Sequence, residues 1–270
     1  MSTSAIFVGK DAMQAQTQKL NVVGDNIANA NTVAYKTRQA LFSDRLGFYG
    51  SGIPANGTTP YLGRGVELVN TVSNWSTGVV QQTTVPTHLA ISGDGFLPVS
   101  LNGSTYYTRD GNFSLVETAT SGEYVLMNPD GAVLQGGALS GTDVTIAGPI
   151  TFAGAPTAIR IYDNGLVEAD GSTVTNGQIG LQRFANNDAL IRHGGGLFQS
   201  TTLASTATTN PTRPGLSGVG PIVQGSLEQS NVDLVNEFSE LIMTQRAYQA
   251  NSRTITTANE MLQEVLNIKR

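Results

Sequence analysis

An apolar heptad column near the C-terminus limits the folds open to this chain more than any other feature of its sequence. From Ser230 onward, apolar side chains recur at alternating steps of four and three residues, and no Gly or Pro interrupts them. This spacing places the side chains along one face of an α-helix, as in the seam of a coiled coil. The column consists of Leu234, Phe238, Leu241, Tyr248, Ile255, Leu262 and Leu266, with polar gaps at Gln245, Ser252 and Asn259.

The start of this C-terminal helix is marked by a candidate capping box. Ser230 is followed three residues later by Asp233, which predicts a helix that begins near Asn231 and runs for about 37 residues, roughly 55 Å. The polar gaps in the column have two interpretations. They either face water, or they lie between helices of a larger lattice and select its register through amide hydrogen bonds.

A second apolar column lies at the opposite end of the chain. It consists of Ile6, Met13, Leu20 and Ile27, each seven residues apart, with Val23 on the same side. Two long helices would each expose an apolar stripe unless they packed on one another or on neighbouring molecules. The two columns therefore predict a coiled coil between an N-terminal helix over residues 1–45 and a C-terminal helix over residues 230–270.

The residues between the two columns follow a β pattern. Short β-branched and aromatic stretches alternate with turn pairs, which are Asp94-Gly95, Asp110-Gly111, Asp130-Gly131, Asn164-Gly165 and Asp170-Gly171. Residues 85–200 are expected to form an antiparallel β domain. Residues 46–84 are expected to be an extended connecting segment with a possible strand at 65–69, and residues 201–229 a linker returning to the C-terminal helix. The predicted fold class is α+β, with N- and C-terminal long helices forming a coiled coil and a central antiparallel β domain.

Charge and composition narrow the classes of function. The chain has 20 acidic and 15 basic residues and a formal net charge of -5, so it offers no basic face for nucleic acid. The absence of cysteine excludes disulfides and thiolate metal sites. No apolar run approaches the ~18 residues of a transmembrane segment, and the N-terminus lacks the regions of a secretory signal peptide. We therefore expect no nucleic-acid partner, no transmembrane segment and, for an exported chain, a route without a cleavable signal peptide.

Catalytic and metal-binding motifs are scarce. His193-Gly-Gly-Gly is similar to the oxyanion loop of lipases, but no Gly-x-Ser-x-Gly nucleophile motif accompanies it. Asp163-Asn-Gly and Asp170-Gly lack the remaining ligands of a calcium loop. The only other histidine is His88, which leaves few choices for a metal site. The sequence predicts no enzyme, no catalytic residue, no metal site and no cofactor.

Short motifs at both ends and in the middle of the chain match those of a known family. Asn26-Ile-Ala-Asn29, followed by Thr32, Tyr35 and Lys36, resembles the N-terminal signature of the bacterial flagellar basal-body rod and hook family, in which a Gly is common at the position of Ala34. The C-terminal residues that resemble the family motif are Gln224, Gly225, Ser230, Asn231, Val232, Gln245, Arg246, Ala247, Tyr248 and Asn251. Residues 91–96, 107–113 and 195–198 resemble the β domain of the family.

The resemblance implies a structural role in the flagellar axial structure. Within the family, the length and the phrase Pro214-Gly-Leu-Ser-Gly-Val-Gly are most similar to distal rod subunits, with a proximal rod or hook subunit as the alternative. The implied subunit self-assembles into a helical tube that spans the periplasm, transmits motor torque and forms the export channel. The implied partners are further copies of the chain, neighbouring rod and hook subunits, the ring proteins of the basal body and the flagellar type III export apparatus.

Two functions of other classes stay open beside the axial one. The β domain could bind a cell-wall polymer while the helices dimerise it, or it could hold an acid/base pair of an enzyme assembled from distant strands. An axial subunit differs from the binding module and from the enzyme because it needs the two apolar columns for polymerisation. Leu241→Asp is expected to abolish polymerisation and to leave the β domain folded.

Overall fold

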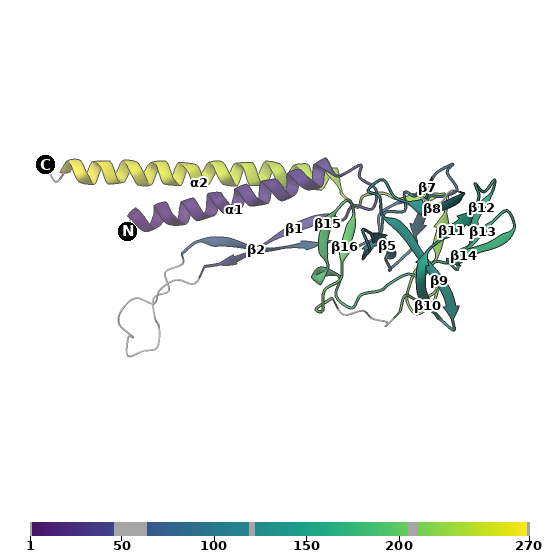
Figure 1. The fold of residues 1–270 in the computed structure, drawn as a ribbon. Helices are drawn as coiled ribbons and strands as arrows, with labels where there is room; N and C mark the ends of the chain where they lie inside the picture. Colours follow the sequence, from purple (N-terminus) through teal and green to yellow (C-terminus); the bar gives the residue numbers. More distant parts are fainter. Residues whose placement is uncertain (1, 46–63, 119–121, 205–209, 269–270) are drawn as a thin grey trace. The chain divides into compact units, whose positions relative to one another are not determined.

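The computed structural model describes residues 2–45, 64–118, 122–204 and 210–268, which form two compact units (Figure 1). The helical unit comprises Met1–Ala30, Thr37–Asn74 and Val232–Arg270. The β unit comprises Asn31–Lys36 and Trp75–Asn231.

The elements are distributed unevenly between the two units. The helices are α1 (Ser2–Ala28) and α2 (Leu234–Ile268), and a short 3-10 turn, η1, spans Asn187–Ala189. The strands are β1 (Arg38–Asp44), β2 (Val66–Ser73), β3 (Val80–Gln82), β4 (Leu89–Ile91), β5 (Leu97–Leu101), β6 (Ser104–Thr108), β7 (Ser114–Glu117), β8 (Glu123–Met127), β9 (Val133–Ser140), β10 (Asp143–Pro149), β11 (Thr151–Ala153), β12 (Ile159–Ile161), β13 (Leu166–Ala169), β14 (Ser172–Gln178), β15 (Ile191–Gly194), β16 (Leu197–Gln199), β17 (Ile222–Gln224) and β18 (Ser226–Glu228). The helical unit contains both helices with β1 and β2, and the β unit contains the other strands.

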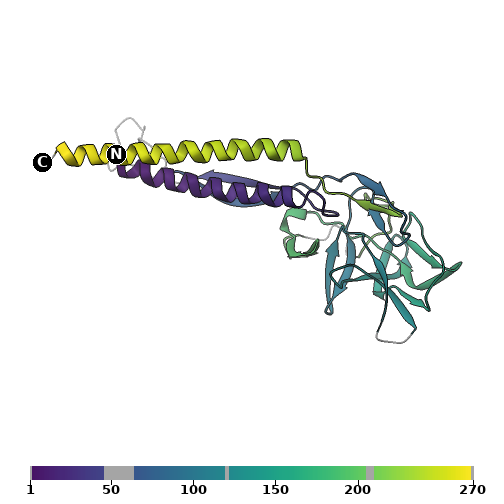
Figure 2. The ribbon, with the colours of Figure 1, turned by 90° about the horizontal axis from the view of Figure 1, so that it is seen from above.

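In the helical unit, α1 packs antiparallel to α2 (Figures 1 and 2). Lys19 Nζ lies 2.6 Å from the Glu240 carboxylate. Towards the start of α1 the helices approach closely at Gly9, where an added Cβ would lie only 2.7 Å from Cγ1 of Ile255. The other neighbour of α1 is the antiparallel β1–β2 pair. One helix is therefore covered by a second helix and by a small sheet.

The face of α2 that packs on α1 differs by one position from the predicted seam. Its buried side chains are Glu237, Thr244 and Ala258, and the half-buried Leu241, Ile255 and Leu262 lie on the same face. The packed face contains Glu237, Thr244, Asn251 and Ala258. The predicted column contained instead the residue after each of these, and these four residues are all exposed: Phe238, Gln245, Ser252 and Asn259. Small and polar side chains at the contact allow close packing, whereas the pattern search followed the larger apolar residues.

The first turn of α2 begins at Leu234, later than predicted. Asp233 is its N-cap, since Asp233 Oδ1 accepts hydrogen bonds from the backbone N–H groups of Val235 (3.0 Å) and Asn236 (3.4 Å). The predicted first residue, Asn231, makes a different backbone hydrogen bond and donates its N–H to the carbonyl of Tyr35. The capping-box interpretation of Ser230 and Asp233 is therefore wrong.

The helix α1 also ends earlier than the predicted helix over residues 1–45. It stops at Ala28, where Asn29 Nδ2 donates to the backbone carbonyl of Asp25 at 2.8 Å. Residues 38–44 are strand β1, whose side chains alternate between half-buried and exposed over its first half, as a strand requires. Of the predicted connecting segment, residues 46–63 lie outside the described residues, and the possible strand at 65–69 overlaps β2 from Val66 onward.

The β unit is built around a sheet of twelve strands. Its main path runs β12-β13-β14-β11-β8-β9-β5-β6-β16-β15, with β10 beside β9 and β7 beside β8. The separate pairs β17–β4 and β18–β3 complete it. Large apolar side chains fill its main core, including Phe113, Leu126, Leu134, Phe152 and Leu181.

Four of the five predicted turn pairs lie between consecutive strands of this sheet, and Asp94-Gly95 lies between β4 and β5. Gly165 connects β12 to β13 with φ +83°, and a Cβ there would lie 2.5 Å from the carbonyl oxygen of Ile179. Both the backbone conformation and the close approach require glycine.

The predicted fold class, α+β with a terminal coiled coil and a central antiparallel domain, is wrong. The structure is mostly β, with 38% strand and 26% helix, and the described residues contain two α-helices. Strand pairing extends beyond residues 85–200, because β1 pairs with β2 and because β3 and β4 pair with β18 and β17. The large sheet is mixed, because β14 runs parallel to β9. The helices form no free-standing coiled coil, since α1 also packs on the β1–β2 pair.

Candidate functional site

The apolar residues predicted in α1 are all at least partly buried in the helical unit, where α1 contacts α2, β1 and β2. Val23 is buried, and Ile6, Met13, Leu20 and Ile27 are half-buried. In α2 the predicted positions divide into two groups: Leu241, Ile255 and Leu262 are half-buried against α1, whereas Leu234, Phe238, Tyr248 and Leu266 are exposed. The structure therefore brings together only part of the predicted seam.

Asn26, the first residue of the N-terminal motif, joins three elements of the helical unit. Its Oδ1 accepts a hydrogen bond from the backbone N–H of Arg38 in β1 at 2.9 Å, and its Nδ2 donates to the Arg38 carbonyl at 2.8 Å. The same Nδ2 lies 3.2 Å from Oε1 of Glu237 in α2. A carboxamide is suited to this position because it both donates and accepts. Asn26 thus fixes where β1 and α2 meet the end of α1.

The next motif residues form a turn that requires an unusual backbone conformation. Ala34 is buried and has φ +56°, in the left-handed region that a Cβ disfavours. This conformation gives a physical reason for the Gly that the resemblance places at this position. The ring of Tyr35 lies 5.6 Å from the guanidinium of Arg192, and Thr32 is exposed.

Lys36, the last residue of the N-terminal motif, belongs to a buried ion cluster in the β unit. Its Nζ lies 2.6 Å from Oε1 of Glu228 and donates to the carbonyl of Ser76 at 2.7 Å. Arg109 Nη1 lies 3.4 Å from Oε2 of the same carboxylate, and Nη2 donates to the Gly93 carbonyl. The side chains of Lys36, Glu228 and Arg109 are 1%, 0% and 3% exposed. We call these three residues the ion cluster.

The electrostatics of the ion cluster are only partly balanced. Burial lowers the pKa of Lys36, the Glu228 carboxylate opposes that shift, and the neighbouring Arg109 reinforces it. Two cations therefore share one carboxylate, with the Asp94 carboxylate as a weaker opposing charge. Glu228 is held further by the backbone N–H of Gly78, which donates to Oε1 at 2.9 Å. The arrangement links residues 31–36 to β18, so that both family motifs meet at Glu228.

The C-terminal motif residues of the β unit are also hydrogen-bonded. Gln224 Nε2 donates to the carbonyls of Pro86 and Ile159, and its Oε1 accepts from the N–H of Ile161. Gly225 donates its N–H to the His88 carbonyl. Asn231 Nδ2 donates to the Ser76 carbonyl at 3.0 Å. These residues connect strands, which is a structural role.

The motif residues within α2 lie along an exposed helix. Gln245, Arg246 and Tyr248 are exposed, and Ala247 and Asn251 are half-buried. Several apolar side chains near the start of α2 are also exposed, among them Val235 (75%), Phe238 (50%) and Ile242 (52%). Their spacing of three and four residues places them on one side of the helix. We call these three residues the outer stripe of α2.

Comparison with known proteins supports the family resemblance along the chain. The family models "Flagella basal body rod protein", "Flagellar hook protein FlgE/F/G D1 domain" and "Flagellar basal body rod FlgEFG protein C-terminal" match residues 6–36, 90–177 and 223–268. The chain is 35% identical to the flagellar basal-body rod protein FlgG of Bacillus subtilis, over 98% of this chain and 99% of the relative. The chain belongs to the flagellar basal-body rod protein family.

Further relatives show the same full-length match. The FlgG protein of Caulobacter vibrioides is 35% identical over 98% of this chain and 99% of the relative. The FlgF rod protein of the same species is 31% identical over 96% and 94%. The sequence-based assignment to the flagellar rod and hook family is confirmed, and with it the interpretation of the chain as a structural rod subunit.

Some important residues of this rod subunit were not predicted as site residues. Glu228 and Arg109 lie within stretches that resemble the family, but a single charged residue in a strand gives no signal of burial. Glu237 is the third, because the heptad column placed it beside the seam.

The candidate catalytic string of the rod subunit forms a turn. Gly194, Gly195 and Gly196 all have positive φ between β15 and β16, and a Cβ on Gly195 would clash with the Asp130 carboxylate. The His193 ring packs on Tyr106, with 4.9 Å between ring centroids. Within the described residues, no group of three or more His, Cys, Asp or Glu side chains could hold a metal ion. Neither described helix carries an apolar stretch of the length needed to cross a lipid bilayer.

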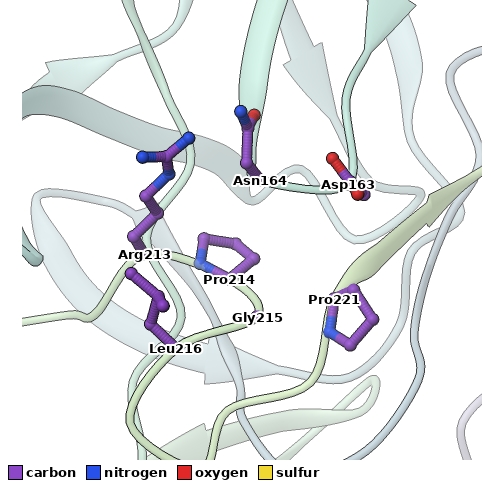
Figure 3. A pocket seen from close by; sticks show the side chains of 7 residues that line it. All are labelled: Asp163, Asn164, Arg213, Pro214, Gly215, Leu216 and Pro221. Carbon is purple, nitrogen blue, oxygen red and sulfur yellow. The ribbon is translucent and has the colours of Figure 1, made fainter.

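A shallow groove of about 340 Å³ lies in the β unit between the β12–β13 turn and residues 213–221. Its lining residues are Asp163, Asn164, Arg213, Pro214, Gly215, Leu216 and Pro221. The side chains of Arg213 and Asp163 stand on opposite sides of it (Figure 3). The groove presents one guanidinium and one carboxylate to solvent, together with proline and leucine surface, and its lining contains no pair of acids of the kind that general acid–base chemistry uses.

Proposed function

We propose that this rod subunit is of the distal type and that it self-assembles into a helical tube. The full-length similarity to proteins named FlgG supports the distal assignment. In this proposal the tube spans the periplasm, transmits motor torque and encloses the export channel. The subunit is exported through the flagellar type III apparatus without a cleavable signal peptide, and it contacts neighbouring rod and hook subunits and the ring proteins around the rod.

The outer stripe of α2 is the observation that carries the self-assembly proposal. Val235, Phe238 and Ile242 are exposed on a helix whose other side already packs on α1. Burying a side chain such as Phe238 stabilises an interface by roughly 2 kcal/mol. In this proposal the outer stripe packs on a different surface of the next subunit, and such a heterologous contact builds an open helical array.

The position of Leu241 in the structure changes the expected effect of Leu241→Asp, the substitution chosen from the sequence. Leu241 is half-buried on the α1 side, so Leu241→Asp should weaken the helical unit itself. Phe238→Asp is the sharper test because Phe238 is half exposed. It should leave the helical unit folded and remove a side chain needed only between subunits.

The test compares sedimentation and electron microscopy of concentrated wild-type chain, Phe238→Asp and Leu203→Asp. Leu203, in the β unit, is 79% exposed and serves as a matched apolar-to-acid control. We expect tubes from wild type and Leu203→Asp, and soluble chain with unchanged helical circular dichroism from Phe238→Asp. If the Phe238→Asp chain formed tubes at the same concentration as wild type, the outer stripe would not be part of the contact between subunits.

A further inference from the structure

Glu237 is a buried acid at the start of α2 with only one of its two carboxyl oxygens hydrogen-bonded. Its side chain is 8% exposed. Oε1 accepts a hydrogen bond from Asn26 Nδ2 at 3.2 Å, and Oε2 is buried without a hydrogen-bond partner among the described residues. An ionised carboxylate accepts through both oxygens and loses much of its hydration in such a place. A neutral carboxyl group loses far less.

Among the residues that the structure describes, no cation close to Glu237 is free to neutralise it. On its own helix the nearby charges are the acids Asp233 and Glu240. On α1 the nearby cation is Lys19, which already pairs with Glu240 at 2.6 Å. On β1, Arg38 donates from Nη2 to Thr71 Oγ1 at 2.7 Å and lies 3.7 Å from the Asp25 carboxylate.

The position of Glu237 in the helix opposes its protonation only weakly. It lies in the first turn of α2, where the helix dipole favours a negative charge. The first free N–H groups of that turn are, however, already bonded to Asp233 Oδ1. The dipole therefore acts at a distance on Glu237, whereas the loss of water acts on the carboxylate directly.

We propose that Glu237 takes up a proton when α2 packs on α1, so that the folding of the helical unit is linked to pH. The neutral acid keeps the hydrogen bond from Asn26 to Oε1, which is then the carbonyl oxygen. At higher pH the unit folds only by burying a charge, and packing of the two helices is weaker. The proposal concerns the helical unit of one chain and goes beyond the assembly role.

The direction of the pH effect follows from the surroundings of Glu237. Burial raises its pKa above the ordinary 4.5, the Asn26 hydrogen bond opposes this, and the Glu240 and Asp233 carboxylates add to it. The folded unit therefore holds the proton more tightly than the unfolded chain. Stability is lost as the pH rises from the unfolded-state pKa through the folded-state pKa, and each pH unit in that window changes the folding equilibrium by up to about tenfold.

The test follows thermal unfolding of α1 and α2 in the full chain by far-ultraviolet circular dichroism, from about pH 4.5 to about pH 8. Glu237→Gln carries an uncharged side chain of the same shape. We expect the wild-type unfolding midpoint to fall as pH rises and the Glu237→Gln midpoint to fall less. The midpoint of the variant minus that of wild type should therefore increase with pH. The matched control is Glu264→Gln, which removes an exposed acid near the other end of α2 and should keep the wild-type pH dependence.

Parallel pH curves for wild type and Glu237→Gln would overturn the proposal. Glu237→Leu supplies the answer where the amide variant does not fold, because it too is uncharged and must show the same loss of pH dependence. A wild-type chain with no helical transition at any pH also overturns the proposal, because the buried carboxyl group would then not form in a single chain.

Discussion

At the scale of single residues, the structure explains the two terminal motifs by a few buried polar atoms. The Glu228 carboxylate pairs with Lys36 and Arg109 and accepts a hydrogen bond from the backbone N–H of Gly78. The Asn26 side chain forms hydrogen bonds with β1 and with α2. Buried polar groups of this kind stabilise a fold only while every partner is present. They therefore specify one arrangement of the chain more than they add to its total stability.

Lys36 gives the clearest prediction at this scale, because the chain offers a matched exposed pair. Lys36→Met should lower the free energy of unfolding of the β unit by about 2 kcal/mol, since the buried Glu228 carboxylate loses a charged hydrogen-bond donor and keeps Arg109. Lys19→Met breaks a pair with the same 2.6 Å separation but with side chains 26% and 36% exposed, and should cost under about 1 kcal/mol. Urea unfolding of the two variants measures both values, and equal losses would contradict the role given to burial.

At the scale of elements, α2 has one side that packs on α1 and another, the outer stripe, that the structure leaves exposed. Thr244 and Ala258 face α1, whereas Val235, Phe238 and Ile242 are exposed. The heptad column predicted that a helix exists here, but it selected a mixture of the two sides. Large apolar residues dominate such a pattern, whereas the fully buried positions of α2 are Glu237, Thr244 and Ala258. The sequence alone could not separate the side of α2 that packs on α1 from the side that is exposed.

The start of α2 gives a prediction for this element. Asp233→Ala should lower helix stability by about 1 kcal/mol, because two N–H groups of the first turn lose their acceptor. Asp233→Asn should retain most of the wild-type stability, since asparagine caps about as well as aspartate. Thermal unfolding followed by helical circular dichroism ranks the three chains. Equal midpoints for Asp233→Ala and wild type would mean that Asp233 is not the effective cap.

At the scale of the whole molecule, the sequence predicted family membership better than architecture. The motifs around Asn26 and Gln224 were sufficient for the family, because they are specific strings of residues. The strand pairing of β1 with β2 and the parallel contact of β14 with β9 depend on residues far apart in the chain, which local periodicity does not contain. The ion cluster was missed for the same reason, since Lys36 and Glu228 are brought together only by the fold.

The central claim is that the helices supply the contacts between subunits of a flagellar rod. Amide hydrogen exchange of the full chain, measured before and after polymerisation, tests it most directly. The account predicts that amides of α1 and α2 gain protection on polymerisation, while those of core strands such as β5, β8 and β9 are protected in both states. Unchanged exchange in both helices, with new protection confined to the β unit, would contradict it.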